Sequence, residues 1–217
     1  MIKTLCLWLA ACAVSVPVAA QTGPVTGQDA DGFSARGVAS VMGQQFAAKT
    51  TFDAVFGESY ERFFGGGVLL AERGVFLEFA FSRFKKTGQR AFLFNGQVYP
   101  LGIPTTVTVS PFEVTGGYRF RRQSAIVPYA GVGIGSYGYT ETSSFADTGE
   151  DVDLRHNGFL VVGGVEFRVH RLIGIAADVQ HTHIPGILGT AGLSKDAGEN
   201  DLGGTSVHAK IIVGLGR

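Results

Sequence analysis

The stretch from Ala125 to Tyr139, AIVPYAGVGIGSYGY, decides the predicted fold because its residues alternate in kind. Ala130, Val132 and Ile134 take one set of positions, and glycines 131, 133 and 135 take the other. Successive side chains of a β-strand point to opposite faces of the sheet. The alternation therefore predicts a strand with one apolar face and one face of small residues.

The glycines of this stretch also resemble part of a dinucleotide-binding fingerprint. That fingerprint requires a helix to begin at the glycines, so that the helix N-terminus can hold the phosphates. Here the alternation continues to Tyr139 and predicts that the strand continues. We therefore expect no nucleotide site, and no other feature of the sequence predicts a cofactor.

Similar alternation recurs along the chain. The clearest further segments are 74–84, 157–169, 172–184 and 207–217; segments 63–70 and 105–120 are less regular, and 37–46 is the faintest. Pro111 interrupts segment 105–120, and its apolar positions change phase between Val109 and Phe112. This interruption predicts a bulge or a later strand start. Together the segments predict eight strands.

The connections between these segments alternate between short and long. The short ones lie at 71–73, 121–124 and 170–171, and the long polar ones lie near 47–60, 86–104, 141–156 and 185–204. Barrels of the bacterial outer membrane have short periplasmic turns and long outer loops. The sequence therefore predicts an all-β fold, an eight-stranded antiparallel up-and-down transmembrane β-barrel, with both chain ends on the side of the short turns.

The N-terminal region reads as a targeting segment. Lys3 precedes a mostly apolar run that ends in Val18-Ala19-Ala20, which predicts a signal peptide over residues 1–20 that is removed on export. Cys6 and Cys12 both fall inside it, and Leu9 to Cys12 also resembles a lipoprotein cleavage box. We expect a flexible segment over 21–36 and the barrel domain over 37–217.

Charge and cysteine content exclude several classes of protein. Removal of residues 1–20 leaves 17 Lys and Arg against 18 Asp and Glu, which argues against a nucleic-acid-binding surface. The predicted mature chain has no cysteine and therefore no disulfide or thiol chemistry.

The face opposite the apolar one should line the lumen, which in an eight-stranded barrel is filled by side chains. Glycines 131, 133, 164 and 174 would relieve crowding there. Charges of both signs share this face, and their pairing would avoid isolated buried charge. The predicted lumen charge network consists of Glu78, Glu113, Arg119, Glu166, Arg168, Asp178 and Lys210.

Three stretches carry a family resemblance: the signal ending at Ala20, the segment 128–135 (PYAGVGIG) and the segment 161–167 (VVGGVEF). With the closing alternation to Leu215, they make the chain similar to the small OmpA-like and OmpX-like outer-membrane barrels of Gram-negative bacteria. The resemblance implies an outer-membrane location, contact with membrane lipids and lipopolysaccharide, and insertion by the barrel assembly machinery. The chain departs from the family in ending Leu215-Gly216-Arg217 instead of in an aromatic residue.

Two groups of residues outside the lumen offer other chemistry. His181 and His183 share one strand face and could serve an enzyme acting on lipid A or phospholipid. Such an enzyme would also need a serine nucleophile and a carboxylate; Ser194 and Asp196 lie in the following loop, but the sequence shows no clear local arrangement of this kind. An acidic outer loop could bind a divalent cation, although its spacing is not that of an EF-hand; its carboxylates are Asp147, Glu150, Asp151 and Asp153. A plain interfacial strand and a solvated loop are the alternative interpretations, and we predict no metal site.

The sequence favours a structural or surface-interaction protein that is not an enzyme. In this interpretation the barrel is the anchor, the paired charges plug the lumen, and the long loops offer a site for an extracellular ligand. A narrow conduction path through the charges, the lipid-modifying enzyme and a soluble periplasmic lipocalin-like barrel with reversed faces remain as alternatives.

Overall fold

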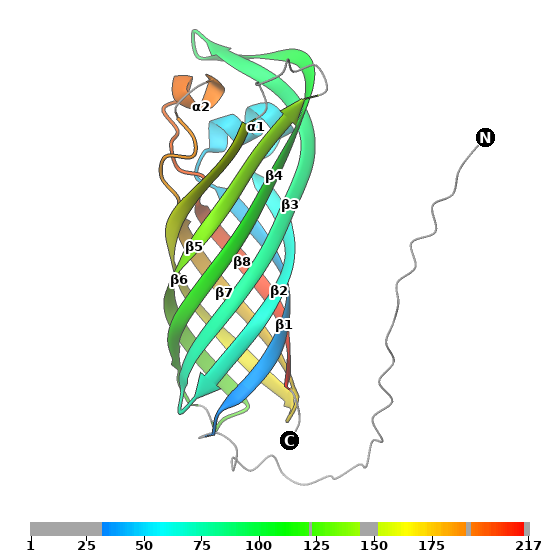
Figure 1. The fold of residues 1–217 in the computed structure, drawn as a ribbon. Coiled ribbons are helices and arrows are strands. Elements are labelled where there is room, and N and C mark those ends of the chain that lie inside the picture. The colour runs from blue at the N-terminus through cyan, green and yellow to red at the C-terminus, as the bar shows by residue number, and fades with distance from the viewer. Residues whose placement is uncertain (1–31, 122, 144–151, 190–191, 215–217) are drawn as a thin grey trace, which may run out of the picture.

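In the computed structural model, which describes residues 32–121, 123–143, 152–189 and 192–214, the chain forms a closed barrel of eight antiparallel strands (Figure 1). Neighbouring strands are consecutive in sequence, and β1 pairs with β8 from Arg36↔Gly214 to Phe46↔Gly204 to close the sheet. The strands are β1 Ser34–Phe46, β2 Tyr60–Glu72, β3 Val75–Phe94, β4 Gln97–Arg119, β5 Ile126–Ser143, β6 Val152–His170, β7 Ile173–His183 and β8 Gly204–Gly214. Closure pairs every strand on both sides, which satisfies the backbone groups that a bilayer cannot.

The predicted fold class, strand number and connectivity are confirmed. The faintest predicted segment is β1, which begins at Ser34, three residues before the expected boundary at 37. Segment 125–139 lies within β5, so the glycines at 131, 133 and 135 continue a strand and do not begin a helix. The predicted signal peptide and the C-terminal residues 215–217 lie outside the described residues.

One end of the barrel carries tight connections (lower end in Figure 1). Between β2 and β3, Arg73 and Gly74 have φ angles of 50° and 90°, the left-handed pair that suits a two-residue hairpin turn. β6 and β7 are joined by residues 171–172, and β8 runs back to this end. By the rule for outer-membrane barrels, this end faces the periplasm.

The opposite end is more elaborate than predicted. Region 47–60 contains α1 Lys49–Phe56, and region 185–204 contains α2 Gly192–Asp196. In the described part of the chain, the helices are too short to serve as membrane spans. Both helices lie at the upper end of the barrel in Figure 1, beside the extension of β3 and β4.

The prediction of a long loop over 86–104 is wrong. β3 and β4 continue through this region as one hairpin, which turns at Asn95 and Gly96 with φ angles of 51° and 75°. The Asn-Gly pair is a strong hairpin signal. This hairpin projects past the barrel, where neither of its faces is consistently in contact with an apolar environment. Its sequence therefore lacks the regular alternation of apolar and polar residues.

The predicted bulge or late strand start near Pro111 is also wrong. β4 pairs with β5 without interruption from Thr105↔Ser143 to Arg119↔Tyr129. Val107, Val109 and Pro111 all point inward, and Phe112 points outward. The apolar residues change face because the lumen is apolar at the outer end and polar below, so the strand itself stays regular.

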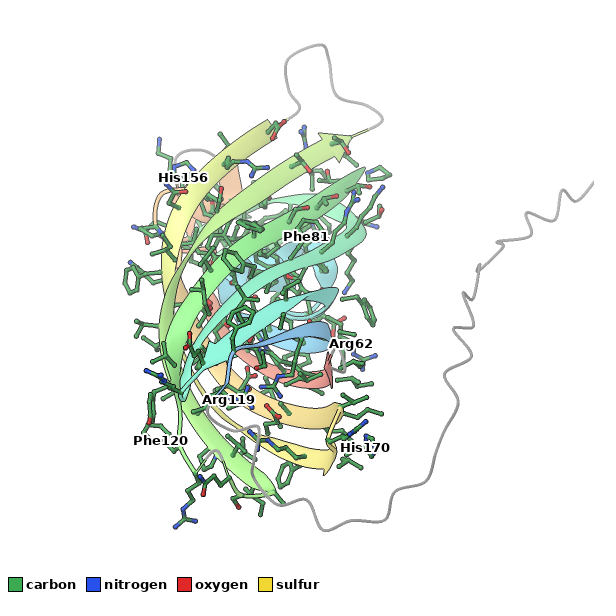
Figure 2. All side chains as sticks on the ribbon, turned by 60° about the horizontal axis from the view of Figure 1, so that its bottom comes forward. Arg62, Phe81, Arg119, Phe120, His156 and His170 are labelled. Carbon is green, nitrogen blue, oxygen red and sulfur yellow. The ribbon has the colours of Figure 1, made fainter. Side chains whose placement is uncertain are left out.

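The outward face below the hairpin is apolar, as a lipid-facing surface requires. Phe81 lies opposite Phe112 on adjacent strands, and Phe81 is visible on the outer wall in Figure 2. Tyr118 and Phe120 pack edge to face near the periplasmic end, at 5.3 Å between ring centroids. Other exposed members include Val132, Ile134, Val161, Ile175, Val179 and Ile211.

The inward glycines allow the strands and lumen side chains to approach closely. A Cβ added at Gly164 would lie 2.4 Å from the Cβ of Asp178, whereas one at the outward Gly163 would meet nothing within 4 Å. Similar crowding surrounds Gly131 and Gly174, which face Phe76 and Glu166 respectively. Small residues therefore sit where the predicted lumen charges need space.

Candidate functional site

The periplasmic third of the lumen holds one carboxylate among several arginines. Glu166 of β6 is fully buried, and its Oε1 lies 2.9 Å from Nη1 of Arg36 and 3.8 Å from Nε of Arg168. Arg119, at the end of β4, contacts the other oxygen, Oε2. Three guanidinium groups from β1, β4 and β6 thus converge on Glu166, which joins strands that are far apart in sequence.

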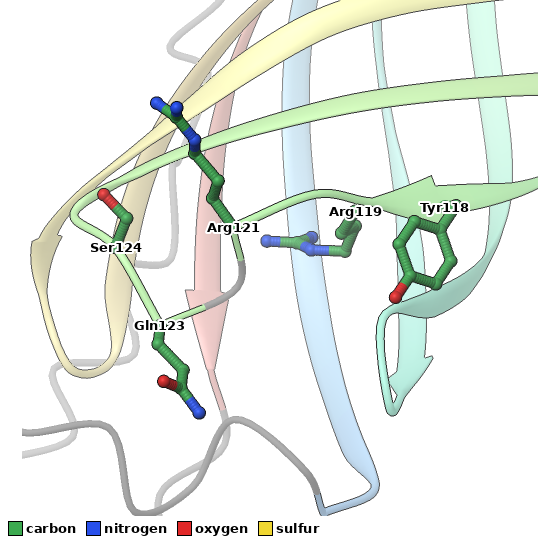
Figure 3. Close-up of a pocket in the computed structure, with 5 residues that line it drawn as sticks. All are labelled: Tyr118, Arg119, Arg121, Gln123 and Ser124. Carbon is green, nitrogen blue, oxygen red and sulfur yellow. The ribbon is translucent and has the colours of Figure 1, made fainter.

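An open pocket of about 570 Å³ lies at the β4–β5 turn below this cluster (Figure 3). It is lined by Tyr118, Arg119, Arg121, Gln123 and Ser124. Figure 3 shows Arg119 and Arg121 pointing in different directions from the turn. Arg119 already contacts Glu166, so the two arginines of this lining do not converge on one ligand position.

The middle of the lumen is organised around Lys210 of β8. Its Nζ donates to Glu78 Oε1 at 3.0 Å and lies 3.1 Å from Asp178 Oδ2. Tyr129 donates its hydroxyl to the same Asp178 oxygen at 2.5 Å, and His208 Nδ1 lies 3.2 Å from Oδ1. Two carboxylates, one ammonium group and two aromatic side chains therefore close this level.

Glu113 lies closer to the outer end and differs from the expected pattern. Its Oε1 accepts hydrogen bonds from the Tyr137 hydroxyl at 2.8 Å and from Gln180 Nε2 at 3.1 Å. Gln180 also donates to Thr182 Oγ1 at 3.0 Å. The expectation that lumen charges pair with each other thus misses Glu113, whose partners in the described chain are neutral donors.

Six residues of the predicted network are buried in the lumen at these three levels, namely Glu78, Glu113, Arg119, Glu166, Asp178 and Lys210. The seventh, Arg168, is partly exposed, and its Nε lies 3.8 Å from Glu166 Oε1. The predicted charge network does not contain Arg36, Tyr129, Tyr137, Gln180 or His208, all of which contact its members. Arg36 lies in the predicted flexible segment 21–36. Tyr129 and Tyr137 are in phase with Gly131 and Gly133, so the alternation itself could have placed them inside.

Apolar side chains fill the outer end of the lumen. Phe46 at the end of β1 stacks on Phe52 of α1, with ring centroids 3.8 Å apart. Phe63 and Phe84 pack beside Phe46, at 6.1 Å and 6.2 Å between centroids. We call this the outer apolar core, and its other members include Val107, Val109, Ile184, Ile187, Leu188 and Leu202.

A carboxylate from the β7–β8 connection holds α1 over this core. Glu199 accepts hydrogen bonds from the backbone amides of Thr50 and Thr51, both at 2.8 Å, and from the Thr51 hydroxyl at 2.7 Å. These amides belong to the first turn of α1, which has no partner for them within the helix. Burial raises the pKa of Glu199, but the hydrogen bonds from Thr51 and Thr50 outweigh it and lower the pKa overall.

The two histidines share the outer face of β7, as predicted, and each has a local partner. His181 Nδ1 lies 3.1 Å from Thr205 Oγ1, and His183 Nδ1 lies 2.6 Å from Asp201 Oδ2. The other Asp201 oxygen accepts the Ile184 and Gly203 amides. The carboxylate beside His183 is therefore Asp201, not Asp196, and it also fixes the loop.

Ser194 is the other loop residue considered for an enzyme. Its Oγ accepts a hydrogen bond from the Gly189 amide at 2.9 Å. Within the described ranges, no group of three or more His, Cys, Asp or Glu is arranged to hold a metal ion. Of the acidic loop, Asp147, Glu150 and Asp151 lie outside those ranges, and Asp153 belongs to β6.

A lipid-facing surface, a closed eight-stranded sheet and a filled lumen define a small transmembrane β-barrel. The chain belongs to the outer membrane protein beta-barrel domain family, whose model matches residues 6–210. The family places the protein in the outer membrane. No curated protein matches the chain significantly in sequence.

Several solved structures are similar to this chain at low sequence identity. Neisserial surface protein A is 16% identical, with a TM-score of 0.54, and the match covers 85% of this chain and 98% of that one. The attachment invasion locus protein Ail of Yersinia pestis, solved with a heparin analogue, is 13% identical, with a TM-score of 0.49, over 85% and 97% of the two chains. The N-terminal barrel of Pseudomonas aeruginosa OprF is 10% identical, with a TM-score of 0.44, over 84% and 98%.

Proposed function

We propose that this protein is a closed, non-catalytic barrel that anchors a surface-interaction platform in the outer membrane. The observation that supports the proposal is the packing of side chains in the lumen: buried polar side chains interact at three levels, and the outer apolar core lies above them. An eight-stranded barrel has room for side chains but not for an aqueous channel as well. The alternative of a conducting path would require both fillings to open together.

The platform consists of α1, α2 and the part of the β3–β4 hairpin beyond the barrel. Near the tip of the hairpin, Phe92 stacks on Tyr99 at 5.2 Å between ring centroids. These rings and Phe94 are 40% to 60% exposed. Exposed apolar side chains that project past the membrane surface are typical of a contact site. They support a role in binding partners outside the cell.

The lipid-enzyme alternative is less well supported. His183 has an orienting carboxylate in Asp201, which is one part of a nucleophilic site. The Asp201 contacts with two backbone amides also explain this carboxylate as a structural clasp for the loop. The anchoring role explains more of the structural features than the enzyme role does.

A conductance measurement on the wild type and an adhesion measurement on the wild type and a variant test the proposal. The purified wild-type barrel should give no stepwise current in a planar bilayer, and regular conductance steps would contradict the closed lumen. For the platform, the triple variant F92S/F94S/Y99S keeps the hairpin but removes its exposed rings. Cells displaying the wild type should adhere to polystyrene and to one another more than cells displaying the variant.

Adhesion is compared between cells that display equal amounts of folded protein on their surface. Folded barrels are recognised by their altered electrophoretic mobility before heating, so each variant is compared unboiled and boiled. The matched control is V132F on the lipid-facing wall, a position that is 65% exposed. Equal adhesion of wild type and triple variant would remove the surface-interaction role and leave only the anchor.

A further inference from the structure

The outer end of the barrel contains a pocket that the lumen filling does not occupy. It has a volume of about 380 Å³ and lies between α1, the α2 region and the outer parts of β3 to β6. Small-molecule sites commonly measure about 300 to 1,000 Å³ and are mainly apolar with a few placed polar groups. This pocket is therefore large enough for a small ligand.

The walls of the pocket are mostly apolar and come from separate parts of the chain. Its apolar lining includes Val55 and Phe56 of α1, Leu101 of β4, Val152 of β6, and Leu188 and Leu193 of the β7–β8 connection. Phe56 and Val152 pack against the outer apolar core but stay partly exposed. A ligand in the pocket would cover apolar surface that the protein leaves accessible, which favours an alkyl group.

One polar group in the lining lacks a partner. Thr105 is only 2% exposed, and its Oγ1 has no hydrogen-bond partner among the described residues. A buried hydroxyl without a partner is unfavourable, and native structures rarely contain one without a reason. A ligand hydroxyl or carbonyl that reached Thr105 would satisfy it.

The charged groups of the pocket already interact with each other. Arg90 Nε lies 3.6 Å from Glu141 Oε1, and the Tyr139 hydroxyl donates to Glu141 Oε2 at 3.3 Å. A charged ligand would have to compete with this arrangement, whereas a neutral one would leave it intact. We propose that the pocket binds a neutral single-chain molecule that carries one hydroxyl or carbonyl group.

The test uses the full barrel in lipid nanodiscs with labelled leucine and valine methyl groups. 1-Octanol is the probe, and 1-chlorooctane serves as a chain of similar length without the hydroxyl. We expect 1-octanol to shift the Leu188 and Leu193 methyl signals saturably. T105V removes the hydroxyl at nearly constant shape. It should weaken the affinity for 1-octanol about tenfold, the value of one hydrogen bond, and should leave the affinity for 1-chlorooctane unchanged.

Substitutions that fill the pocket provide a second test of the proposal. V152W and L101W each place a large ring in the pocket from a different strand and should abolish the shifts. V132F on the lipid-facing wall should retain them. Mobility before heating verifies that each variant is folded. Non-saturable shifts in the wild type, or equal affinities of wild type and T105V for 1-octanol, would overturn the proposal.

The same chemistry could come from the surrounding medium or from a single-chain lipid of the membrane. Protein purified from native membranes is therefore heat-denatured, and any released lipid is analysed by mass spectrometry. A neutral single-chain lipid released by the wild type and absent from V152W identifies the membrane as the source. Its absence, together with saturable 1-octanol binding, identifies the medium. Neither result depends on the conductance and adhesion tests of the proposed function.

Discussion

The periplasmic and outer ends of this barrel are filled by side chains of different chemistry. Around Glu166, long polar side chains from the strand walls meet in ion pairs. Around Phe46, aromatic rings pack with the help of α1, and the β7–β8 connection covers them. The difference follows from the connections that the structure describes at each end: the tight turns at the periplasmic end are too short to cover the lumen, whereas the longer connections at the outer end supply a helix and a loop.

The two ends should therefore respond differently to substitution. Buried charges depend strongly on each partner, because an unpaired charge in a confined lumen keeps its desolvation cost. A change at the periplasmic end should affect the whole barrel, since Glu166 ties β1, β4 and β6 together. A change in the cover of the outer end should remain local to α1.

The largest effect is expected for E166Q. Three arginines would lose their shared carboxylate, and the free energy of unfolding should fall by about 3 to 5 kcal/mol, the usual result of breaking a buried pair. Urea titration of the barrel in lipid vesicles measures this change. E72Q, in the exposed end of β2, is the matched control and should change little.

A double-mutant cycle with R119Q tests whether Glu166 and Arg119 stabilise the barrel as a pair. Removal of Arg119 as well should restore part of the lost stability, because fewer positive charges then remain unpaired. Additive losses in E166Q/R119Q would show that the two side chains do not act as a pair.

An intermediate effect is expected for G164A. Its new Cβ would lie 2.4 Å from Asp178 Cβ and 2.6 Å from the Ala177 carbonyl oxygen, and the backbone cannot easily move away. Overpacking of this kind costs about 1 to 3 kcal/mol. The adjacent G163A, with nothing within 4 Å of its Cβ, is the control in the same vesicle assay. Equal stability of the two variants would show that the lumen beside Gly164 has room for a methyl group.

The smallest effect is expected for E199Q at the outer end. Loss of the charged cap should destabilise the first turn of α1 by about 1 kcal/mol without changing the stability of the barrel. Hydrogen exchange of the Phe52 to Phe56 amides measures the local change. D196N removes a nearby exposed charge and should leave the exchange unchanged. Faster exchange throughout the strands would contradict a local role.

The cap by Glu199 should make the stability of the first turn of α1 depend on pH. The pKa of Glu199 is lowered in the folded protein, so its contribution is complete above the ordinary pKa of a glutamate and is lost as the pH falls through the lowered value. Exchange of the α1 amides in the wild type should therefore approach that of E199Q only in acid. A difference between the two proteins that persists at the lowest pH would exclude this titration.

The sequence predicted the parts of the fold that a periodic pattern can carry. Alternation gave the strand in 125–139 and put Glu166 and Asp178 on the inward face, and both placements agree with the structure. The same reasoning failed at Pro111, because a change in lumen filling looked like a break in the strand. It also failed over 86–104, where a hairpin outside the barrel has no single buried face to mark its period.

Sequence alone determined the number and order of the strands, the apolar belt and the candidates for the lumen, but not the outer extensions of β3 and β4. Each of these features depends on neighbours in the chain and on side chains alternating between two faces. Only the tertiary structure decided which candidates meet. Arg36 and Glu166 are 130 residues apart, and Glu199 reaches Thr51 across 148 residues. Barrel closure, strand register and loop folding set those distances together, so no local pattern could predict the ion pairs, the helix cap or the outer pocket.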